Sequence, residues 1–347
     1  MHEALASRTL ELVDFASESR GEAPLAQHVL GLLPDARDAG DTCVLAGVTQ
    51  RGERPLVLLA GHFDTVPAQD NRPGRRDADS VHGLGASDMK AGLAVMIELA
   101  LADAGDRAVD LGFVFFGREE LPVSESALTP LLEREPGLRK ADLAIVMEPT
   151  DNALQAGCLG NLNATWTFAG VAGHSARPWL ADNAIHRAAR GIAALDEVPV
   201  EEHSHDGLTF REAVSVTRVA GGIADNVVPD TATALVNYRY APGREPAGAE
   251  ERLRSWCEPH GALEIVSHAP SGRVPENNAL VERLRAAGGL ALEPKQAWTP
   301  VAEFALAGVD AINFGPGDPR FAHRRDEQVS LAALERSYAV LDRFACA

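Results

Sequence analysis

The sequence offers little that would suit a membrane or an oxidising compartment. Only four cysteines occur in 347 residues, at positions 43, 158, 257 and 346, and none forms a C-x-x-C pair. Neither a disulfide framework nor a structural zinc knuckle is therefore predicted. No apolar run reaches the length of a membrane span, and the first residues lack the basic start and apolar run of a secretory signal. We expect a reduced protein of the cytoplasm.

Positive charge is also scarce. The chain has 32 Lys and Arg against 50 Asp and Glu, which gives a formal net charge of -18. Nucleic acids and anionic membranes bind to basic faces, so we expect neither as a partner. An anionic substrate would need arginines gathered at its binding site to overcome this negative field.

The length and the pattern of apolar residues predict two domains, the first of them α/β. A chain of 347 residues exceeds what one hydrophobic core usually organises. In the first 150 residues, short apolar runs at 55–60, 111–116 and 143–147 alternate with helical patterns, as in strands covered on both faces. Each run ends in a polar cluster, and open α/β sheets place ligands beyond the carboxyl ends of their strands.

These polar clusters contain the first candidate functional residues. His62 and Asp64 could simply cap a turn; alternatively, Asp64 could hold one imidazole nitrogen of His62 and leave the other for a metal ion. Glu119 and Glu120 form a like-charge pair that is either exposed to solvent or neutralised by cations. In the second case one carboxylate can bind metal while the other takes a proton from water. Glu148 follows the third apolar run.

Two further segments are ambiguous when taken alone. Residues 83–90 read GLGASDMK and open an apolar helix, with Asp88 near the helix start. They do not form a convincing dinucleotide fingerprint, because the third glycine is absent and the preceding segment is polar. His323 ends the segment GPGDPRFAH at 315–323. Neither segment by itself indicates a function.

After residue 157 the pattern changes, which predicts an inserted domain. Strands and helices are expected in the order β-α-β-β-α-β, at 164–171, 183–195, 214–219, 232–240, 247–256 and 263–266. A unit of this size can close its own two-layer core. We therefore expect a domain at 158–270 inserted into a first domain formed by 1–157 and 271–347.

Together these segments resemble the M20 family of metallopeptidases. The motifs are GHFDTVP at 61–67, G-x-G-x-x-D-M-K-x-G at 83–92, the pair at 119–120, Glu148-Pro149 and the late His323, in the order found in the family. The resemblance implies a zinc-peptidase-like α/β catalytic domain. It also implies that the insertion is a ferredoxin-like domain that forms a homodimer and acts as a lid.

The same resemblance implies a centre with two divalent ions. His62 and Glu148 would bind one ion, Glu120 and His323 would bind the other, and Asp88 would bridge both. A mixture of nitrogen and oxygen ligands suits Zn²⁺, with Co²⁺ as an alternative.

The resemblance further implies roles in catalysis and substrate binding. Glu119 would be the general base for attack of water on an amide carbon, with Asp64 assisting from beside His62. His174 of the inserted domain would reach the active site of the partner subunit and hydrogen-bond the oxyanion. Three further residues would bind the substrate: Arg177, Asn226 and Arg239.

Three segments resemble one subfamily in particular, the actinobacterial succinyl-diaminopimelate desuccinylases: GHSARP at 173–178, GGIADNVVPD at 221–230 and NFGPGDP at 313–319. This implies hydrolysis of N-succinyl-LL-2,6-diaminopimelate to succinate and LL-2,6-diaminopimelate. Such enzymes usually read Thr-Asp where this chain reads Thr299-Pro300, which lacks the carboxylate. Two alternatives stay open: another deacylase or peptidase of the family, acting on acetylornithine, an N-acyl amino acid or a dipeptide, and a catalytically silent metal-binding scaffold.

Overall fold

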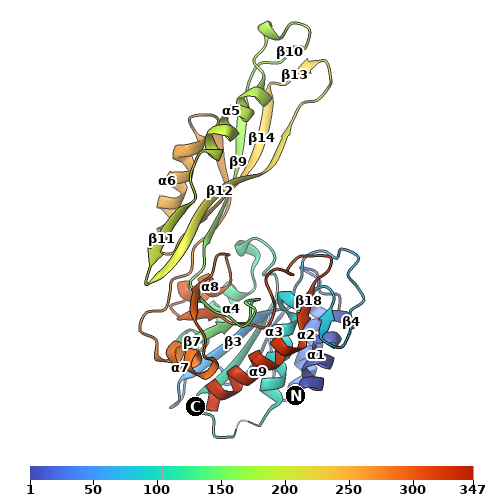
Figure 1. Cartoon of the computed structure of the whole chain (residues 1–347), viewed down its shortest axis with the longest axis vertical. Helices are drawn as coiled ribbons and strands as arrows, with labels where there is room; N and C mark the ends of the chain where they lie inside the picture. The colour runs from blue at the N-terminus through green and yellow to red at the C-terminus, as the bar shows by residue number, and fades with distance from the viewer. Residues whose placement is uncertain (104, 347) are drawn as a thin grey trace. The chain divides into compact units, whose positions relative to one another are not determined.

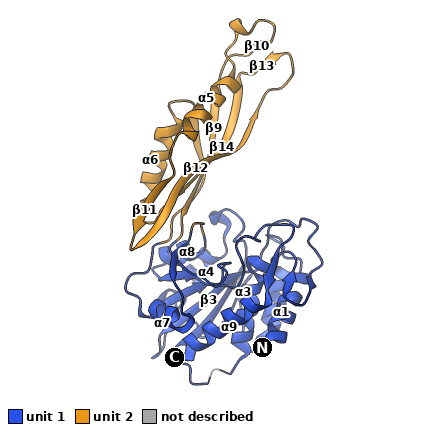
Figure 2. Cartoon of the chain, viewed as in Figure 1, with its two compact units in different colours: residues 1–157, 273–295, 299–347 blue, residues 158–272, 296–298 orange. Residues whose placement is uncertain are grey.

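The computed structural model describes residues 1–103 and 105–346, which divide into two compact units (Figure 2). Unit 1 consists of Met1–Gly157, Arg273–Lys295 and the chain from Thr299 onward, and unit 2 of Cys158–Gly272 and Gln296–Trp298. Unit 2 is thus mainly one continuous segment inserted into the sequence of unit 1. No helix of the described residues is long and apolar enough to cross a membrane.

Unit 1 is built on a mixed sheet whose centre is parallel. Within the described residues its strands lie in the order β1-β2-β6-β3-β7-β17-β8-β16, and β6, β3, β7 and β17 run parallel to one another. The bounds are β1 (Arg37–Gly40), β2 (Cys43–Gly47), β3 (Leu56–His62), β6 (Asp110–Phe116), β7 (Leu143–Val146), β8 (Leu154–Ala156), β16 (Leu292–Pro294) and β17 (Ala311–Asn313). A smaller sheet contains β4 (Arg75–Arg76), β5 (Ser80–His82) and β18 (Gln328–Ser330).

The predicted apolar strands of unit 1 are confirmed. Every residue of β3, β6 and β7 is buried, as expected for strands that are covered on both faces and are therefore mostly apolar. The parallel direction of these three strands brings their carboxyl ends to the same edge of the sheet. The polar clusters that follow them are thereby drawn together.

The helices of unit 1 pack around this sheet. Figure 1 shows α1 (His2–Asp14), α3 (Ala91–Leu101) and α9 (Leu331–Cys346) side by side, and all three contact one another. The remaining helices are α2 (Ala23–Leu32), α4 (Leu128–Arg134), α7 (Ala279–Gly288) and α8 (Val301–Leu306), with short turns η1 (Ala86–Lys90), η2 (Val123–Glu125) and η3 (Leu138–Lys140).

The chain enters α3 through an irregular turn. In η1 the N–H of Lys90 donates to the carbonyl of Gly85 at 2.8 Å, and Asp88 has the non-helical angles φ -122° and ψ 96°. Gly85 has φ +80°, and a Cβ atom there would lie 2.9 Å from a methyl group of Thr65. Only glycine fits such a position without strain. Gly85 thus allows a tight turn, which places Asp88 before the first residue of α3.

Unit 2 is an antiparallel sheet with helices against it. Its strands lie in the order β11-β12-β14-β9-β15, and its largest buried side chains include Trp166, Phe168, Tyr238 and Tyr240. The bounds are β9 (Gly160–Ala169), β10 (Gly173–His174), η4 (Pro178–Leu180), α5 (Ala184–Asp196), β11 (Glu201–His205), β12 (Leu208–Gly221), β13 (Val227–Val228), β14 (Thr231–Tyr240), α6 (Pro246–Cys257) and β15 (Ala262–Ala269).

The predicted β-α-β-β-α-β order is present, with additions. The prediction omitted the edge strand β11, whose sequence EEHSH is charged and polar because edge strands avoid apolar side chains that would recruit other chains. It also omitted the short pair β10 and β13. Two-residue strands are too short to produce a period in the sequence.

Candidate metal centre

Three of the five candidate ligands of unit 1 lie where parallel strands end. His62 is the last residue of β3, Glu120 follows β6, and Glu148 follows β7. Asp88 comes from the turn η1, and His323 from the segment before β18. The structure brings these five predicted ligands and Glu119 together through the contacts described next.

One side of the cluster is centred on His62, whose side chain is fully buried. Its Nε2 atom lies 3.3 Å from Asp88 Oδ1, 3.7 Å from Glu148 Oε1 and 3.9 Å from Glu119 Oε2. Its Nδ1 atom lies 2.9 Å from the backbone oxygen of Asp64. A carbonyl oxygen can only accept, so Nδ1 carries the donated proton and Nε2 is available to a metal ion.

The other side is centred on His323. Its Nε2 atom lies 2.9 Å from Glu120 Oε1 and 3.4 Å from Asp88 Oδ2. Asp88 therefore directs one carboxylate oxygen to each imidazole, which is the geometry that a bridging ligand between two ions requires.

Asp64 organises the loop that carries the two glutamates. Its Oδ1 accepts the backbone N–H of Glu119 at 2.9 Å, and its Oδ2 accepts that of Glu120 at 3.0 Å and the hydroxyl of Ser19 at 2.8 Å. The short contact to His62 comes from the backbone of Asp64, while its carboxylate stands 3.5 Å from Nδ1. The carboxylate thus positions the glutamates more directly than it positions the imidazole.

The crowding of acids perturbs their protonation. Burial raises the pKa of Glu119 well above its usual value, and the nearby Glu148 adds to the rise. Burial and then Asp88 raise the pKa of Glu148 to about 7, and burial also raises that of Glu120. Hydrogen bonds to Asp88 and Glu120 raise the pKa of His323 to about 11. Divalent ions bound to these side chains would favour their unprotonated forms.

The donor set fits divalent ions on three observations. Glu148 Oε1 is buried and has no hydrogen-bond partner, although buried polar atoms are nearly always satisfied. Two groups of potential ligand atoms, one from His62, Glu119 and Glu148 and one from His62, Asp88 and Glu120, each lie within 4.8 Å of one another. Imidazole and carboxylate ligands together suit zinc.

Several supporting residues could not be predicted from the sequence. Glu22 is 1% exposed, and its Oε1 accepts the N–H of Arg118 at 3.1 Å, next to the glutamate pair. Glu327 is 2% exposed and accepts three backbone N–H groups around Asp88. Both contacts join residues far apart in the chain, so no local pattern indicates them.

The candidate residues of unit 2 fall into two places. His174 lies on β10, beside β13, and Ser175 N–H donates to the carbonyl of Asn226 at 2.9 Å, so His174, Arg177 and Asn226 lie in neighbouring segments and are all exposed. Arg239 lies near the far end of β14, which begins at Thr231 beside β13. Thr231 and Arg239 are eight residues apart in this strand, which corresponds to about 26 Å at a rise of about 3.3 Å per residue.

Comparison with known proteins identifies the class to which this site belongs. The chain belongs to peptidase family M20/M25/M40, whose model matches residues 58–347. This confirms the predicted family and, with it, a metal-dependent hydrolase fold.

Individual relatives give a closer comparison. A Corynebacterium glutamicum protein named succinyl-diaminopimelate desuccinylase is 36% identical over 97% of this chain and 94% of its own length. A Mycobacterium tuberculosis protein, provisionally named as the same enzyme, is 39% identical over 97% of this chain and 96% of its own length. Aminopeptidase PepT from Bacillus cereus has a similar fold, with a TM-score of 0.79, 18% identity, and coverage of 99% of this chain and 98% of that one.

Proposed function

We propose that this chain hydrolyses the amide bond of N-succinyl-LL-2,6-diaminopimelate, releasing succinate and LL-2,6-diaminopimelate. The observation that carries the proposal is the carboxylate of Asp88 directed at both His62 and His323, in a chain that resembles named desuccinylases over nearly its whole length. The residues that would hold two ions are His62, Asp88, Glu120, Glu148 and His323. Zn²⁺ is the proposed metal, with Co²⁺ as the other candidate.

The protein's own residues account for the proton transfers. When bound, divalent ions supply a Lewis acid that polarises the amide carbonyl and makes water more acidic. Glu119 accepts the proton of the water that attacks the amide carbon, and it returns that proton to the amine nitrogen as the C–N bond breaks. Burial and the neighbouring Glu148 raise the pKa of Glu119, while cations bound beside it would favour the carboxylate form that accepts the proton.

His174 is proposed to stabilise the oxyanion that forms during this attack. The N–H of Ala176 donates to His174 Nδ1 at 3.0 Å. Because Nδ1 accepts this bond, the neutral ring carries its proton on Nε2, and Nε2 is then a hydrogen-bond donor that an oxyanion could use.

The substrate residues of unit 2 support a homodimer through residues 158–270. Arg239 and Asn226 belong to regions about 26 Å apart along β14, so one copy of unit 2 does not present both to one small carboxylate. A dimer in which each chain completes the site of its partner would use both positions. Arg177 and Arg239 would also supply the local positive charge that a succinyl carboxylate needs in this acidic protein. We further propose that the enzyme works in the cytoplasm.

A substrate panel tests this function. Zinc-loaded protein is assayed for initial rates on N-succinyl-LL-2,6-diaminopimelate, N-acetylornithine, several N-acyl amino acids and a dipeptide, with a chelator-treated control. We expect metal-dependent turnover with a selective preference for the succinyl substrate. Preference for another substrate would contradict the proposed specificity but not the metal chemistry. Pro300, which stands where such enzymes usually have aspartate, would then be the first residue to examine. No metal-dependent turnover on any substrate would favour a silent metal-binding scaffold.

A further inference from the structure

Glu327 lies outside the predicted ligand set but contacts the turn that carries Asp88. Its side chain is 2% exposed. Its Oε1 accepts the backbone N–H groups of Ser87 at 3.0 Å and Asp88 at 2.9 Å, and its Oε2 accepts that of Gly85 at 2.9 Å. One side chain therefore satisfies three backbone donors within four consecutive residues.

The turn needs such an acceptor because of its irregular backbone. Asp88 has non-helical angles, so the N–H groups around it are not all paired as they would be within an α-helix, and buried backbone donors must find partners. A carboxylate offers two oxygen atoms that only accept. A glutamine would place its NH₂ group against at least one of these N–H groups, and two donors facing each other repel.

Glu327 is also tied to the segment that carries His323. Its backbone N–H donates to the carbonyl of Arg324 at 3.2 Å, and its own carbonyl accepts the N–H of Gly83 at 3.0 Å. Asn71 contributes from a third segment, because its Nδ2 donates to the same Arg324 carbonyl at 3.2 Å. The residue thus connects the loop of Asp88 to the loop of His323 through both its side chain and its backbone.

We propose that Glu327 is a positioning residue that holds Asp88 and His323 at the spacing needed to bind two ions. This inference rests on the metal centre of the proposed function. It predicts that loss of the Glu327 carboxylate lowers metal affinity even though Glu327 itself does not bind metal. Substitution of a residue that orients metal ligands without binding the metal typically lowers metal affinity by about 10–100-fold.

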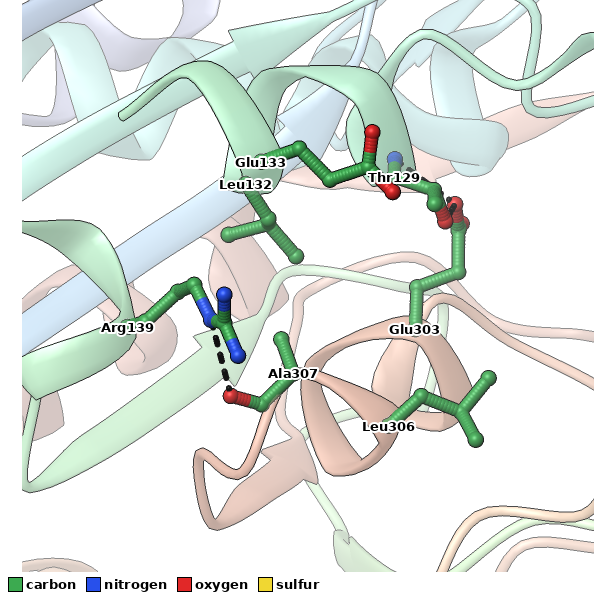
Figure 3. A pocket seen from close by; sticks show the side chains of 7 residues that line it. All are labelled: Thr129, Leu132, Glu133, Arg139, Glu303, Leu306 and Ala307. Atoms are coloured by element: carbon green, nitrogen blue, oxygen red, sulfur yellow. Dashed lines mark hydrogen bonds between the residues drawn. The ribbon is translucent and has the colours of Figure 1, made fainter. Parts of the chain in front are cut away.

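The test compares Glu327→Gln with a matched buried carboxylate. Glu303 on α8 is also 2% exposed, and its Oε1 accepts the N–H of Thr129 at 3.0 Å and the hydroxyl of Thr129 at 2.6 Å. It lines a separate cavity, with none of the candidate metal ligands among the lining residues (Figure 3). Glu303→Gln therefore removes a buried carboxylate of unit 1 without touching the loops of Asp88 and His323.

Zinc affinity is measured by calorimetric titration of chelator-stripped protein, together with the melting temperature of the metal-free form. We expect both variants to lower the melting temperature and only Glu327→Gln to weaken zinc binding, by about 10-fold or more. Unchanged affinity in Glu327→Gln, or equal weakening in Glu303→Gln, would overturn the positioning role while leaving the proposed function intact. Failure of the wild-type protein to bind zinc would instead reject the metal centre itself.

A milder variant keeps the inference testable if Glu327→Gln does not fold. Asn71→Ala removes only one side chain's contacts, including the bond to the Arg324 carbonyl, and leaves the carboxylate of Glu327 in place. We expect a smaller loss of zinc affinity than in Glu327→Gln, confined to the ion that Glu120 and His323 would bind. Wild-type affinity for both ions in this variant would count against the coupling of the two loops.

Discussion

Glu119 and Glu120 are consecutive in the chain, yet their carboxylates make their shortest imidazole contacts with different histidines. Glu120 Oε1 lies 2.9 Å from His323 Nε2, whereas Glu119 Oε2 lies 3.9 Å from His62 Nε2. Asp64 helps to fix this divergence, since its two oxygens accept the N–H groups of the two glutamates separately. Neighbouring residues can therefore serve as a ligand and as a base.

The first prediction separates these two roles. Glu119→Gln should lower kcat by about 10²–10⁴-fold, because the general base is lost, while the zinc content stays at the wild-type value. Glu120→Gln should instead reduce the zinc content. Both quantities are read from steady-state kinetics and metal analysis of the same preparations. Equal loss of zinc in both variants would contradict the division of labour.

A second prediction concerns the carboxylate of Asp64. Asp64→Asn places an NH₂ group where an oxygen now accepts the N–H of Glu119 or Glu120, so the glutamate loop should shift. We expect kcat to fall and zinc affinity to weaken by about 10–100-fold. The control is Ser19→Ala, which removes only the hydroxyl that donates to Asp64 and should have a much smaller effect. Indistinguishable kinetics in the two variants would show that the carboxylate does not position the loop.

The sequence indicated the strands that carry the ligands but not the contacts that hold the ligands in place. The apolar run at 55–60 corresponds to most of β3 (Leu56–His62), because strands covered on both faces are apolar along nearly all of their length. By contrast, the bond from Gly85 to Glu327 spans 242 residues. A pairing of this kind depends on the folded chain and leaves no period or spacing in the sequence.

The third prediction tests whether His174 acts in the partner's site. His174→Ala and Glu119→Gln homodimers should each be nearly inactive, but a mixed dimer would contain one site with both residues intact. If the two chains assemble at random, about half of the dimers are mixed, and activity should recover to about a quarter of the wild-type value. When the mixed dimer is isolated by two affinity tags after co-expression, one of its two sites is intact, so its activity should be about half of the wild-type value. No recovery on mixing would place His174 in its own chain's site, and an active His174→Ala homodimer would place it outside catalysis.

The fourth prediction is a pH dependence of stability from unit 2. Glu212 is 3% exposed and accepts bonds from Arg244, Tyr238 and the N–H of Ala241. Burial alone would raise its pKa, but these bonds outweigh burial and hold the pKa below its usual value of 4.5. A lowered pKa in the folded state stabilises the protein above pH 4.5, and this stabilisation is lost as the pH falls through the folded-state pKa.

Denaturant titrations of Glu212→Gln across pH should reveal that loss. We expect the variant to be less stable than wild type by on the order of 2 kcal/mol at pH 7, with the difference shrinking below pH 4.5. Glu264→Gln is the control, because Glu264 is exposed on β15 of the same unit, and it should change stability by less than about 0.5 kcal/mol. If the difference in unfolding free energy between Glu212→Gln and wild type stayed constant from pH 7 to pH 3, protonation of Glu212 would not contribute to the pH dependence of stability.

The most direct test of the metal-dependent mechanism is a titration of activity with zinc. Chelator-stripped protein is supplied with increasing equivalents of Zn²⁺, and hydrolysis of N-succinyl-LL-2,6-diaminopimelate is measured at each step. We predict no turnover without metal and a rise that levels off near two equivalents per chain, with Glu119→Gln binding the same amount of zinc but remaining inactive. Turnover by the metal-free protein, or full activity in Glu119→Gln, would contradict the proposed mechanism.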